Sequence, residues 1–422
     1  MFNKSRNIFI TLTIFVISLI GQTPDQVLAD GKNELNNGQF VRAESLFTQA
    51  LDMDPTFAPA MLELARLNLR LGKMQETGDF LRRAIDADPE NQEFRDEFDR
   101  INEINTLMND ASRYMNDTDY ANAFESYRIV LEKFPFFAEA AYSMGLVKNR
   151  EKILNEAVQH FKKALEINPY HEKAIKALDN VTKKSFNDGN RAYKRGDLDG
   201  AIEAYYKVLE FDEKFYQAHY QIGVIKAKMG DRNGAIGHYQ QALDINPNFY
   251  KGWYAMGLSK KSNSDNEGAL AAFRAAVDVH PAYDKAFGAM GEIYLNEKNY
   301  DKAIEVLNTS VQVNSKYSKG YSTLGVVYSE MEEWANAANN LVLATTYNEK
   351  DAMAWYRLAL AYNQLDECDR AEEAARNSTD RKPSFGGGWI ELGVQHGVEV
   401  KGIKWHPLMH WRRHAKIVPG GK

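Results

Sequence analysis

The feature that most constrains this chain is a fixed interval between prolines. Proline recurs with a period of about 34 residues in the pairs Pro55–Pro89, Pro135–Pro169 and Pro247–Pro281. A period of about 20–50 residues is typical of a supersecondary unit that stacks on copies of itself. Proline lacks an amide hydrogen and clashes with the preceding helical turn, so each of these prolines is expected to end a helix. Counting back from each one places ten repeats between Pro24 and Phe385.

Small and large residues recur at fixed positions within the repeat. The eighth position is always Gly or Ala: Gly31, Ala65, Ala111, Gly145, Gly189, Gly223, Gly257, Gly291, Gly325 and Ala359. A glycine inside a helix costs about 1 kcal/mol relative to alanine, so its recurrence predicts a close crossing of two helices. The twentieth position is alanine in every repeat except at Thr77. The twenty-fourth carries the large side chain of the crossing: Phe47, Leu81, Tyr127, Phe161, Tyr205, Tyr239, Phe273, Leu307, Leu341 and, last, a small Ala375.

These positions resemble the tetratricopeptide repeat. The seventh repeat shows the pattern most clearly, with Trp253, Met256, Gly257, Ala269, Phe273, Ala276 and Pro281. The resemblance implies an all-α fold, a right-handed superhelical solenoid of helix-turn-helix repeats. It also implies a concave face, lined by the first helix of each repeat, that binds a peptide or protein partner.

Two insertions interrupt the period. The interval lengthens between Pro89 and Pro135, and again between Pro169 and Glu213, by about three helical turns each. The inserted residues lack Gly and Pro, so Gln92–Asn116 and His171–Lys194 are predicted to be continuous, elongated first helices. The predicted domains are repeats 1–2 over 23–91, repeats 3–4 over 92–171 and repeats 5–10 over 172–385. Each insertion is interpreted either as a helical spacer or as a docking ridge or bend.

The N-terminal residues predict export. Lys4 and Arg6 precede an apolar run, Ile8–Ile20, that contains no charged residue. A membrane-spanning helix needs roughly 20 such residues, whereas the core of a signal peptide needs about 7–15. Residues 1–22 are therefore predicted to be a signal peptide, cleaved between Gly21 and Ala29, which places the mature chain in the periplasm or outside the cell. The alternative is an uncleaved anchor that holds the chain at a membrane through residues 8–20.

A capping pattern follows the apolar run. Thr23, Pro24 and Gln26 match a helix start with a capping box and favour cleavage near Gly21.

At the C-terminal end, Trp389 begins an eleventh first helix that is not followed by a second helix, so 386–422 is predicted to be a capping helix with an irregular tail. Residues 398–422 hold six Lys or Arg and one acidic residue. A slip of the reading frame after Gly397 would explain this composition.

Composition narrows the function. The net charge is −6, which argues against a nucleic-acid partner because phosphate neutralisation needs basic clusters. A single cysteine, Cys368, excludes an internal disulfide and a thiolate metal cluster. Recognisable phosphate-loop, metalloprotease and nucleophile motifs are missing, so we expect no enzymatic activity, no cofactor and no metal site. His406, His410 and His414 have helical metal-ligand spacing, but Pro407 interrupts them.

The candidate binding residues come from the face that the resemblance makes concave. The fifth position is aromatic in four successive repeats, and aromatic side chains dominate binding hot spots. The candidate groove residues are Tyr142, Phe186, Tyr220, Tyr254 and Tyr356 at position five, Tyr193 at position twelve, Asn190 at position nine, and Lys183, Lys251, Lys285 and Lys319 at position two. The alternatives are packing between repeats for the aromatic residues and ordinary solvated lysines for the basic ones.

Some proteins of this family clamp a partner's C-terminal carboxylate with Lys and Asn at positions five and nine. Here Asn190 has Phe186 in place of the lysine, and Val224 follows in the next repeat. The clamp is therefore absent. The sequence predicts an exported scaffold that binds a protein segment in its groove and supports assembly of a multiprotein complex. The alternatives are a membrane-anchored envelope assembly factor and a glycan-binding accessory subunit of an envelope enzyme.

Overall fold

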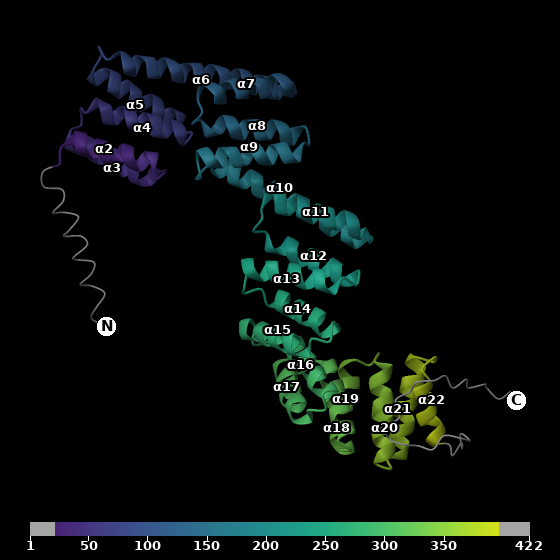
Figure 1. The fold of residues 1–422 in the computed structure, drawn as a ribbon. Helices are drawn as coiled ribbons and strands as arrows, with labels where there is room; N and C mark the ends of the chain where they lie inside the picture. The colour runs from purple at the N-terminus through teal and green to yellow at the C-terminus, as the bar shows by residue number, and fades with distance from the viewer. Residues whose placement is uncertain (1–21, 396–422) are drawn as a thin grey trace, which may run out of the picture. The chain divides into compact units, whose positions relative to one another are not determined.

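The computed structural model describes residues 22–395, and these residues form helices joined by short turns, without a strand among them (Figure 1). The predicted all-α solenoid of helix-turn-helix repeats is confirmed. The predicted signal peptide and the tail after Gly397 lie outside the described residues. The described residues contain no helix that is long and apolar enough to cross a membrane.

The helices follow one another in antiparallel pairs, one pair per repeat. In the first five repeats they are α2 (Pro24–Asn36), α3 (Phe40–Met53), α4 (Ala58–Arg70), α5 (Met74–Ala87), α6 (Gln92–Asn116), α7 (Tyr120–Lys133), α8 (Ala138–Arg150), α9 (Leu154–Ile167), α10 (Glu172–Arg195) and α11 (Leu198–Phe211). In the last five they are α12 (Tyr216–Lys228), α13 (Arg232–Ile245), α14 (Tyr250–Ser262), α15 (Asn266–Val279), α16 (Asp284–Asn296), α17 (Tyr300–Val313), α18 (Ser318–Glu330), α19 (Trp334–Tyr347), α20 (Ala352–Gln364) and α21 (Cys368–Arg381). Helix α22 (Gly386–Gln395) follows.

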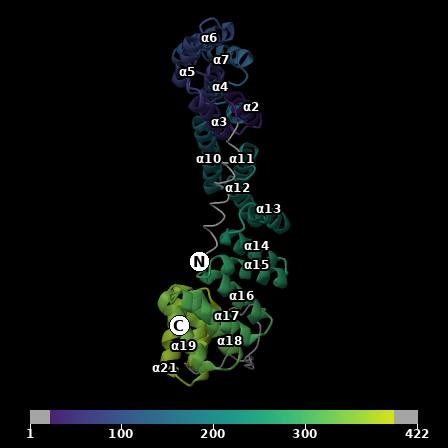
Figure 2. The same ribbon diagram turned by 90° about the vertical axis from the view of Figure 1, so that its left-hand side faces the viewer.

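The chain divides into two compact units. The N-terminal unit runs to Lys194 and includes 210–212, and the C-terminal unit contains Arg195–Leu209 and the residues from Glu213 onward. Within the C-terminal unit, successive helices from α12 to α18 lie in chain order in both views (Figures 1 and 2). The three-block division drawn from the two insertions remains a prediction.

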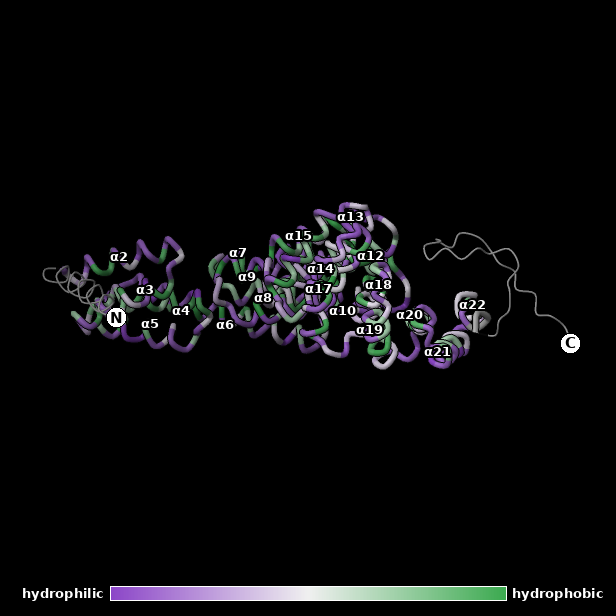
Figure 3. Tube along the Cα trace, turned by 90° about the horizontal axis from the view of Figure 1, so that it is seen from below, coloured by the Kyte–Doolittle hydropathy of each residue, from purple (hydrophilic) through white to green (hydrophobic). Residues whose placement is uncertain are grey.

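The glycine at position eight contacts the large residue at position 24 of its own repeat. A Cβ atom added to Gly257 would lie 2.5 Å from Cε1 of Phe273, a ring that is fully buried. The same pairing recurs at 2.5–2.6 Å in five other repeats: Gly31 with Phe47, Gly145 with Phe161, Gly223 with Tyr239, Gly291 with Leu307 and Gly325 with Leu341. The close helix crossing that the sequence predicts is confirmed. Figure 3 shows hydrophobic and hydrophilic residues alternating along helices such as α2, α4 and α5.

Local signals at helix ends also match the sequence. The Thr23 side chain accepts a hydrogen bond from the Gln26 amide, and the Gln26 side chain accepts one from the Thr23 amide, so the predicted capping box is present. The turn between the two helices of a repeat needs a residue with positive φ. Gly72 (φ 76°) and Gly230 (φ 88°) take this conformation without a Cβ clash.

The inserted turns of α6 pack on the preceding repeat. Phe94 and Ile101 are buried in the same core as residues of α4. Arg66 of α4 forms ion pairs with Glu93 at 2.9 Å and Glu97 at 3.6 Å, and Glu97 is 8% exposed. Helix α6 spans the range that the sequence predicts as one continuous helix. Its N-terminal half therefore contributes to the core of the N-terminal unit.

Candidate partner-binding cleft

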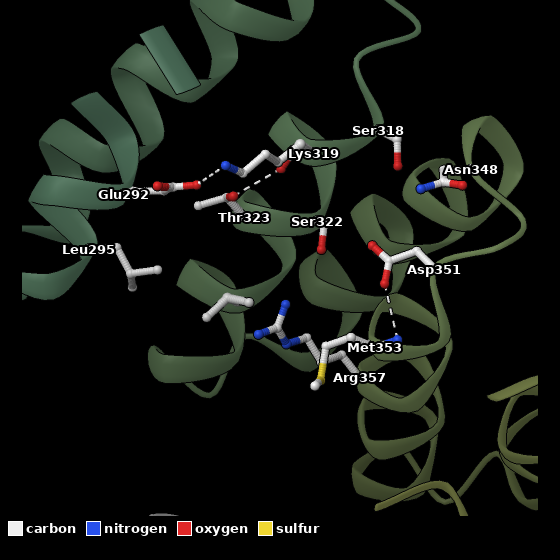
Figure 4. A pocket seen from close by; sticks show the side chains of 11 residues that line it. Glu292, Leu295, Ser318, Lys319, Ser322, Thr323, Asn348, Asp351, Met353 and Arg357 are labelled. Atoms are coloured by element: carbon white, nitrogen blue, oxygen red, sulfur yellow. Dashed lines mark hydrogen bonds and ion pairs between the residues drawn. The ribbon is translucent and has the colours of Figure 1, made fainter. Parts of the chain in front are cut away.

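A cleft of about 470 Å³ lies along three first helices of the C-terminal unit, α16, α18 and α20 (Figure 4). We call it the Arg357 cleft. Its walls are formed by Glu292, Leu295, Ser318, Lys319, Ser322, Thr323, Val326, Asn348, Asp351, Met353 and Arg357. First helices of consecutive repeats present their side chains here because the second helices pack behind them. Of the sequence-predicted groove residues, only Lys319 lines this cleft.

Glu292 joins three repeats at one edge of the cleft. Its carboxylate pairs with the Nζ atoms of Lys261 at 2.5 Å and Lys319 at 2.6 Å, as Figure 4 shows for Lys319. Burial alone would raise the pKa of Glu292, but the hydrogen bonds from the two lysines outweigh burial and hold the pKa below its usual value. Lys319 is therefore partly neutralised by the protein itself.

Arg357 is the other cation in the cleft, and its situation differs. Its side chain is half-buried, and burial lowers the pKa of its guanidinium, with Asp351 opposing the shift. One oxygen of the Asp351 carboxylate, Oδ1, accepts hydrogen bonds from the Met353 and Ala354 amides at the start of α20. Among residues 22–395, no ion pair or hydrogen bond reaches the Arg357 guanidinium. The cleft thus holds a partly desolvated positive charge that forms no ion pair among the described residues, and Asp351 acts on it only from a longer distance.

Polar groups line the space between these charges. Ser318 donates its hydroxyl to the Ala344 carbonyl at 2.9 Å, and Thr323 donates to the Lys319 carbonyl at 2.9 Å. Ser322 and Asn348 also face the cleft (Figure 4). Hydroxyl and amide groups of this kind can pair with the backbone of an extended segment, while Arg357 offers a bidentate fork to a carboxylate.

The predicted aromatic residues of the C-terminal unit lie between repeats. The Tyr254 ring is 5.6 Å from Phe273 of its own repeat and 5.2 Å from Tyr283, the residue just before α16. Tyr220 repeats this arrangement with Tyr239 and with Phe249, just before α14. Tyr356 lies 5.3 Å from Phe385, which again directly precedes the next first helix, α22. Burial raises the pKa of Tyr254 and of Tyr356. Each ring is half-buried, so each side chain joins two repeats and keeps an exposed edge.

The N-terminal unit contains the other predicted aromatic residues. The Tyr142 ring is 5.8 Å from Phe161 and 5.2 Å from His171, the same two-sided contact. Phe186, Tyr193 and Asn190 are half-buried on α10. Lys183 is exposed on the same helix and pairs with Asp179 at 2.7 Å, one turn away.

The remaining predicted lysines, Lys251 and Lys285, are exposed on α14 and α16. Lys251 lies 5.8 Å from the centre of the Tyr250 ring. Sequence reasoning missed Arg357 because it read positions two, five, nine and twelve, and Arg357 occupies position six. The same position holds Ala255, Ala289 and Thr323 in the three preceding repeats. The change from three small residues to a large cation at position six is the sequence signal that could have identified Arg357.

Family models match most of the described chain. Models described as tetratricopeptide repeat or TPR repeat match residues 34–96, 110–172, 189–230, 216–249, 254–317 and 323–384. Those segments include all or part of the six repeats in which the glycine at position eight contacts the large residue at position 24. The chain belongs to the tetratricopeptide-repeat family. It is thus built from repeats of a protein-interaction family.

Individual relatives are distant. The chain is 28% identical over 211 residues to the mouse and human proteins named DnaJ homolog subfamily C member 7, an alignment that covers 42% of this chain and 43% of each relative. The chain therefore spans less than half the length of these curated relatives.

One similar solved structure is that of Pseudomonas aeruginosa pilF, which is 16% identical in sequence. The match covers 52% of this chain and 99% of that chain, with a TM-score of 0.46. Another is YrrB, described as a TPR protein with an unusual peptide-binding site, which is 16% identical in sequence. That match covers 45% of this chain and 97% of that chain, with a TM-score of 0.37. At these values the likeness concerns the fold alone.

Proposed function

We propose that this chain is an exported, non-enzymatic tetratricopeptide-repeat scaffold that holds an extended segment of a partner protein in the Arg357 cleft. The observation that carries the proposal is the half-buried Arg357 guanidinium, which forms no ion pair and no hydrogen bond among the described residues. The polar side chains of Ser318, Lys319, Ser322 and Thr323 on α18 line the same cleft. In a protein-interaction family, such an arrangement fits recognition of a partner.

The charge of Arg357 identifies the chemistry of that segment. A partly desolvated cation gains more from a carboxylate than a solvated one does, because the local dielectric constant is lower than that of water. Arginine presents two parallel N–H groups that match a carboxylate. We infer that the segment carries an Asp, a Glu or a C-terminal carboxylate at the point where it meets Arg357. Lys319 lends further positive charge, although Glu292 already binds it.

Export is the second part of the proposal. It rests on Lys4 and Arg6 before the apolar run Ile8–Ile20. Mass spectrometry of the mature chain in its native host gives the N-terminus directly. A start between Gly21 and Ala29 supports export, whereas a chain that keeps residues 8–20 and remains with membranes supports the anchored assembly factor.

The binding experiment compares wild-type protein with Arg357→Gln. Cross-linking of the mature chain in its native compartment, followed by mass spectrometry, identifies candidate partners, and binding of the cross-linked segment is then measured as a synthetic peptide. Arg357→Gln is expected to weaken binding by roughly 2–5 kcal/mol, the range for one partner of a desolvated charge pair. The matched control is Arg376→Gln on the exposed side of α21, where Arg376 pairs with Glu372.

Two results contradict the proposal. In the first, the segment binds equally well to both arginine variants and to wild type. In the second, glycan arrays bind the chain and peptide arrays do not, which would favour the glycan-binding accessory subunit.

A further inference from the structure

The most exposed large apolar side chains of the described residues gather in one place on the N-terminal unit. They are Val41 (70% exposed), Phe136 (62%) and Tyr170 (59%). Tyr170 lies edge-on to Phe40, with ring centres 6.3 Å apart, and Phe40 and Val41 are consecutive residues of α3. Phe136 joins this group through Arg70, whose Cζ atom lies 4.2 Å from the Phe136 ring centre and 5.6 Å from that of Phe40. We call Phe40, Val41, Arg70, Phe136 and Tyr170 the aromatic–arginine patch.

The repeat does not require these apolar residues. Phe136 and Tyr170 occupy position 33, directly after a proline, where the other repeats carry Thr56, Glu90, Lys214, Asn248, Ala282, Lys316, Lys350 and Ser384. Val41 occupies position 18, where the other repeats carry Gln75, Ala121, Asn155, Asp199, Asn233, Glu267, Asp301, Ala335 and Asp369. Polar or small residues therefore serve the fold at both positions. The three exceptions come from three different repeats, the first, third and fourth. Val41 and Tyr170 line one cleft, and Arg70 connects Phe136 to Phe40 beside them.

Arg70 gives the patch its charge. It is half-buried at the end of α4, and burial lowers the pKa of its guanidinium. Within residues 22–395 the Arg70 side chain forms no ion pair and no hydrogen bond. Its guanidinium instead makes cation–π contacts with the Phe40 and Phe136 rings. Stacking on rings leaves the edge of a guanidinium open to a carboxylate.

Two clefts flank the patch, and their own carboxylates are occupied. One, of about 360 Å³, is lined by Arg70, Phe136, Glu63 and Glu97, and the other, of about 470 Å³, by Phe40, Val41 and Tyr170. The five carboxylates along the two clefts each lie within 4 Å of a cation: Glu63 pairs with Arg66, Glu97 with Arg100, Glu44 with Lys73, Glu139 with Lys173 and Glu172 with Lys176. Among the described cations that line the two clefts, Arg70 is thus the one without a carboxylate partner.

We propose that the aromatic–arginine patch is a second protein-binding surface, and that it takes a segment with an aromatic or large aliphatic side chain next to an acidic one. The apolar side chain would cover Phe136 and Tyr170, whose exposed area is otherwise in water. The carboxylate would pair with Arg70. Aromatic residues and arginine are the residue types most enriched at binding hot spots. The surface belongs to the N-terminal unit and is separate from the Arg357 cleft.

The test is a selection from a random peptide library displayed on phage, made against the full mature chain. Selected peptides are synthesised, and their affinities are measured for wild type, Phe136→Ser, Tyr170→Ser and Arg70→Gln. Peptides that combine an aromatic or aliphatic residue with a neighbouring Asp or Glu should bind wild type and lose at least about tenfold in affinity with each variant. Replacing their acidic residue by its amide should weaken binding to wild type and leave binding to Arg70→Gln unchanged. Circular dichroism of each variant checks the fold.

Matched controls separate this surface from others. Met229→Ser removes an exposed apolar side chain (54% exposed) from the C-terminal unit and should not change these affinities. Arg357→Gln should not change them either. The proposal is overturned if no selected peptide depends on Phe136, or if the dependent peptides lack acidic residues. It is also overturned if sedimentation shows a dimer that Phe136→Ser dissociates, or if residues 1–21 of the uncleaved chain compete for the patch.

Discussion

Replacing Gly257 by alanine tests the contact on which the repeat register depends. The new Cβ atom would lie 2.5 Å from the Phe273 ring, well inside the distance that real side chains adopt. Phe273 is fully buried in the core of α15 and α16, so its ring has no free space to enter. The two helices must separate or the ring must leave its preferred rotamer. Gly257→Leu would exaggerate the same conflict.

A matched glycine isolates the size of this effect. Gly237 lies inside α13, and a Cβ atom there would meet nothing within 4 Å. Both substitutions gain the helix preference of alanine over glycine, about 1 kcal/mol. Only Gly257→Ala adds overpacking, which costs about 1–3 kcal/mol. The free energy of unfolding should therefore be about 1–3 kcal/mol lower for Gly257→Ala than for Gly237→Ala.

Urea denaturation of the mature chain measures this difference, and hydrogen exchange locates it. Protection should fall first in α14 to α17, because each repeat of a solenoid is stabilised mainly by its neighbours. In a double-mutant cycle, Phe273→Ala should cost about 1–3 kcal/mol less in the Gly257→Ala background than in wild type. Equal stabilisation by Gly237→Ala and Gly257→Ala would refute the close crossing, as would strict additivity in the cycle.

Three further predictions concern charge, the aromatic contacts and pH. Arg66→Met should destabilise the N-terminal unit by about 1–3 kcal/mol, because Glu63 and Glu97 each lose one counterion but keep Lys32 and Arg100. In the same urea titration, Arg82→Met, on an exposed surface, should change the unfolding free energy by less than about 0.5 kcal/mol. Tyr254→Ala should lower the free energy of unfolding by about 1–3 kcal/mol, which is less than the loss typical of a fully buried ring. Tyr254→Phe should leave the free energy of unfolding unchanged. An unchanged melting temperature with weaker partner binding would instead make Tyr254 a contact residue. Burial, together with the neighbouring His219, lowers the pKa of His238 from 6.5 to about 4. The unfolded chain therefore binds the proton more readily, and the stability of the fold should decrease as the pH is lowered from about 6.5 to 4. His238→Gln should flatten this part of the stability–pH curve, and an unchanged slope would contradict the prediction.

Much of the fold could be read from residue spacing because a solenoid uses the same contacts in every repeat. The pairing of position eight with position 24 follows from size alone, as Gly257 and Phe273 show. The capping box at Thr23 is a local hydrogen-bond pattern, so it needed no tertiary information. Helix α6 was predicted over its full length because its insertion lacks Gly and Pro.

The site was harder to predict because it depends on contacts between repeats. Reading position five alone placed Tyr220 and Tyr254 in a groove but could not show that their rings reach Phe249 and Tyr283, each at the junction with the following repeat. Whether Arg357 has a counterion is likewise a question of three-dimensional distance. Asp351 is near in sequence, yet it forms no ion pair with Arg357, and its Oδ1 atom accepts hydrogen bonds from the Met353 and Ala354 amides.

In this repeat protein, residues that differ from the usual type at their position are better candidates for binding than residues that recur. Recurrence at one position in several repeats is explained by a packing contact that those repeats share, and the two-sided contacts of Tyr142 and Tyr254 are of that kind. A residue that departs from its position's usual type meets no such requirement. Phe136 is an exposed aromatic residue at a position where eight of the ten repeats carry a polar or small residue. Arg357 is a half-buried cation at a position where the three preceding repeats carry small residues. Because folding does not account for such exceptions, binding is the stronger explanation for them.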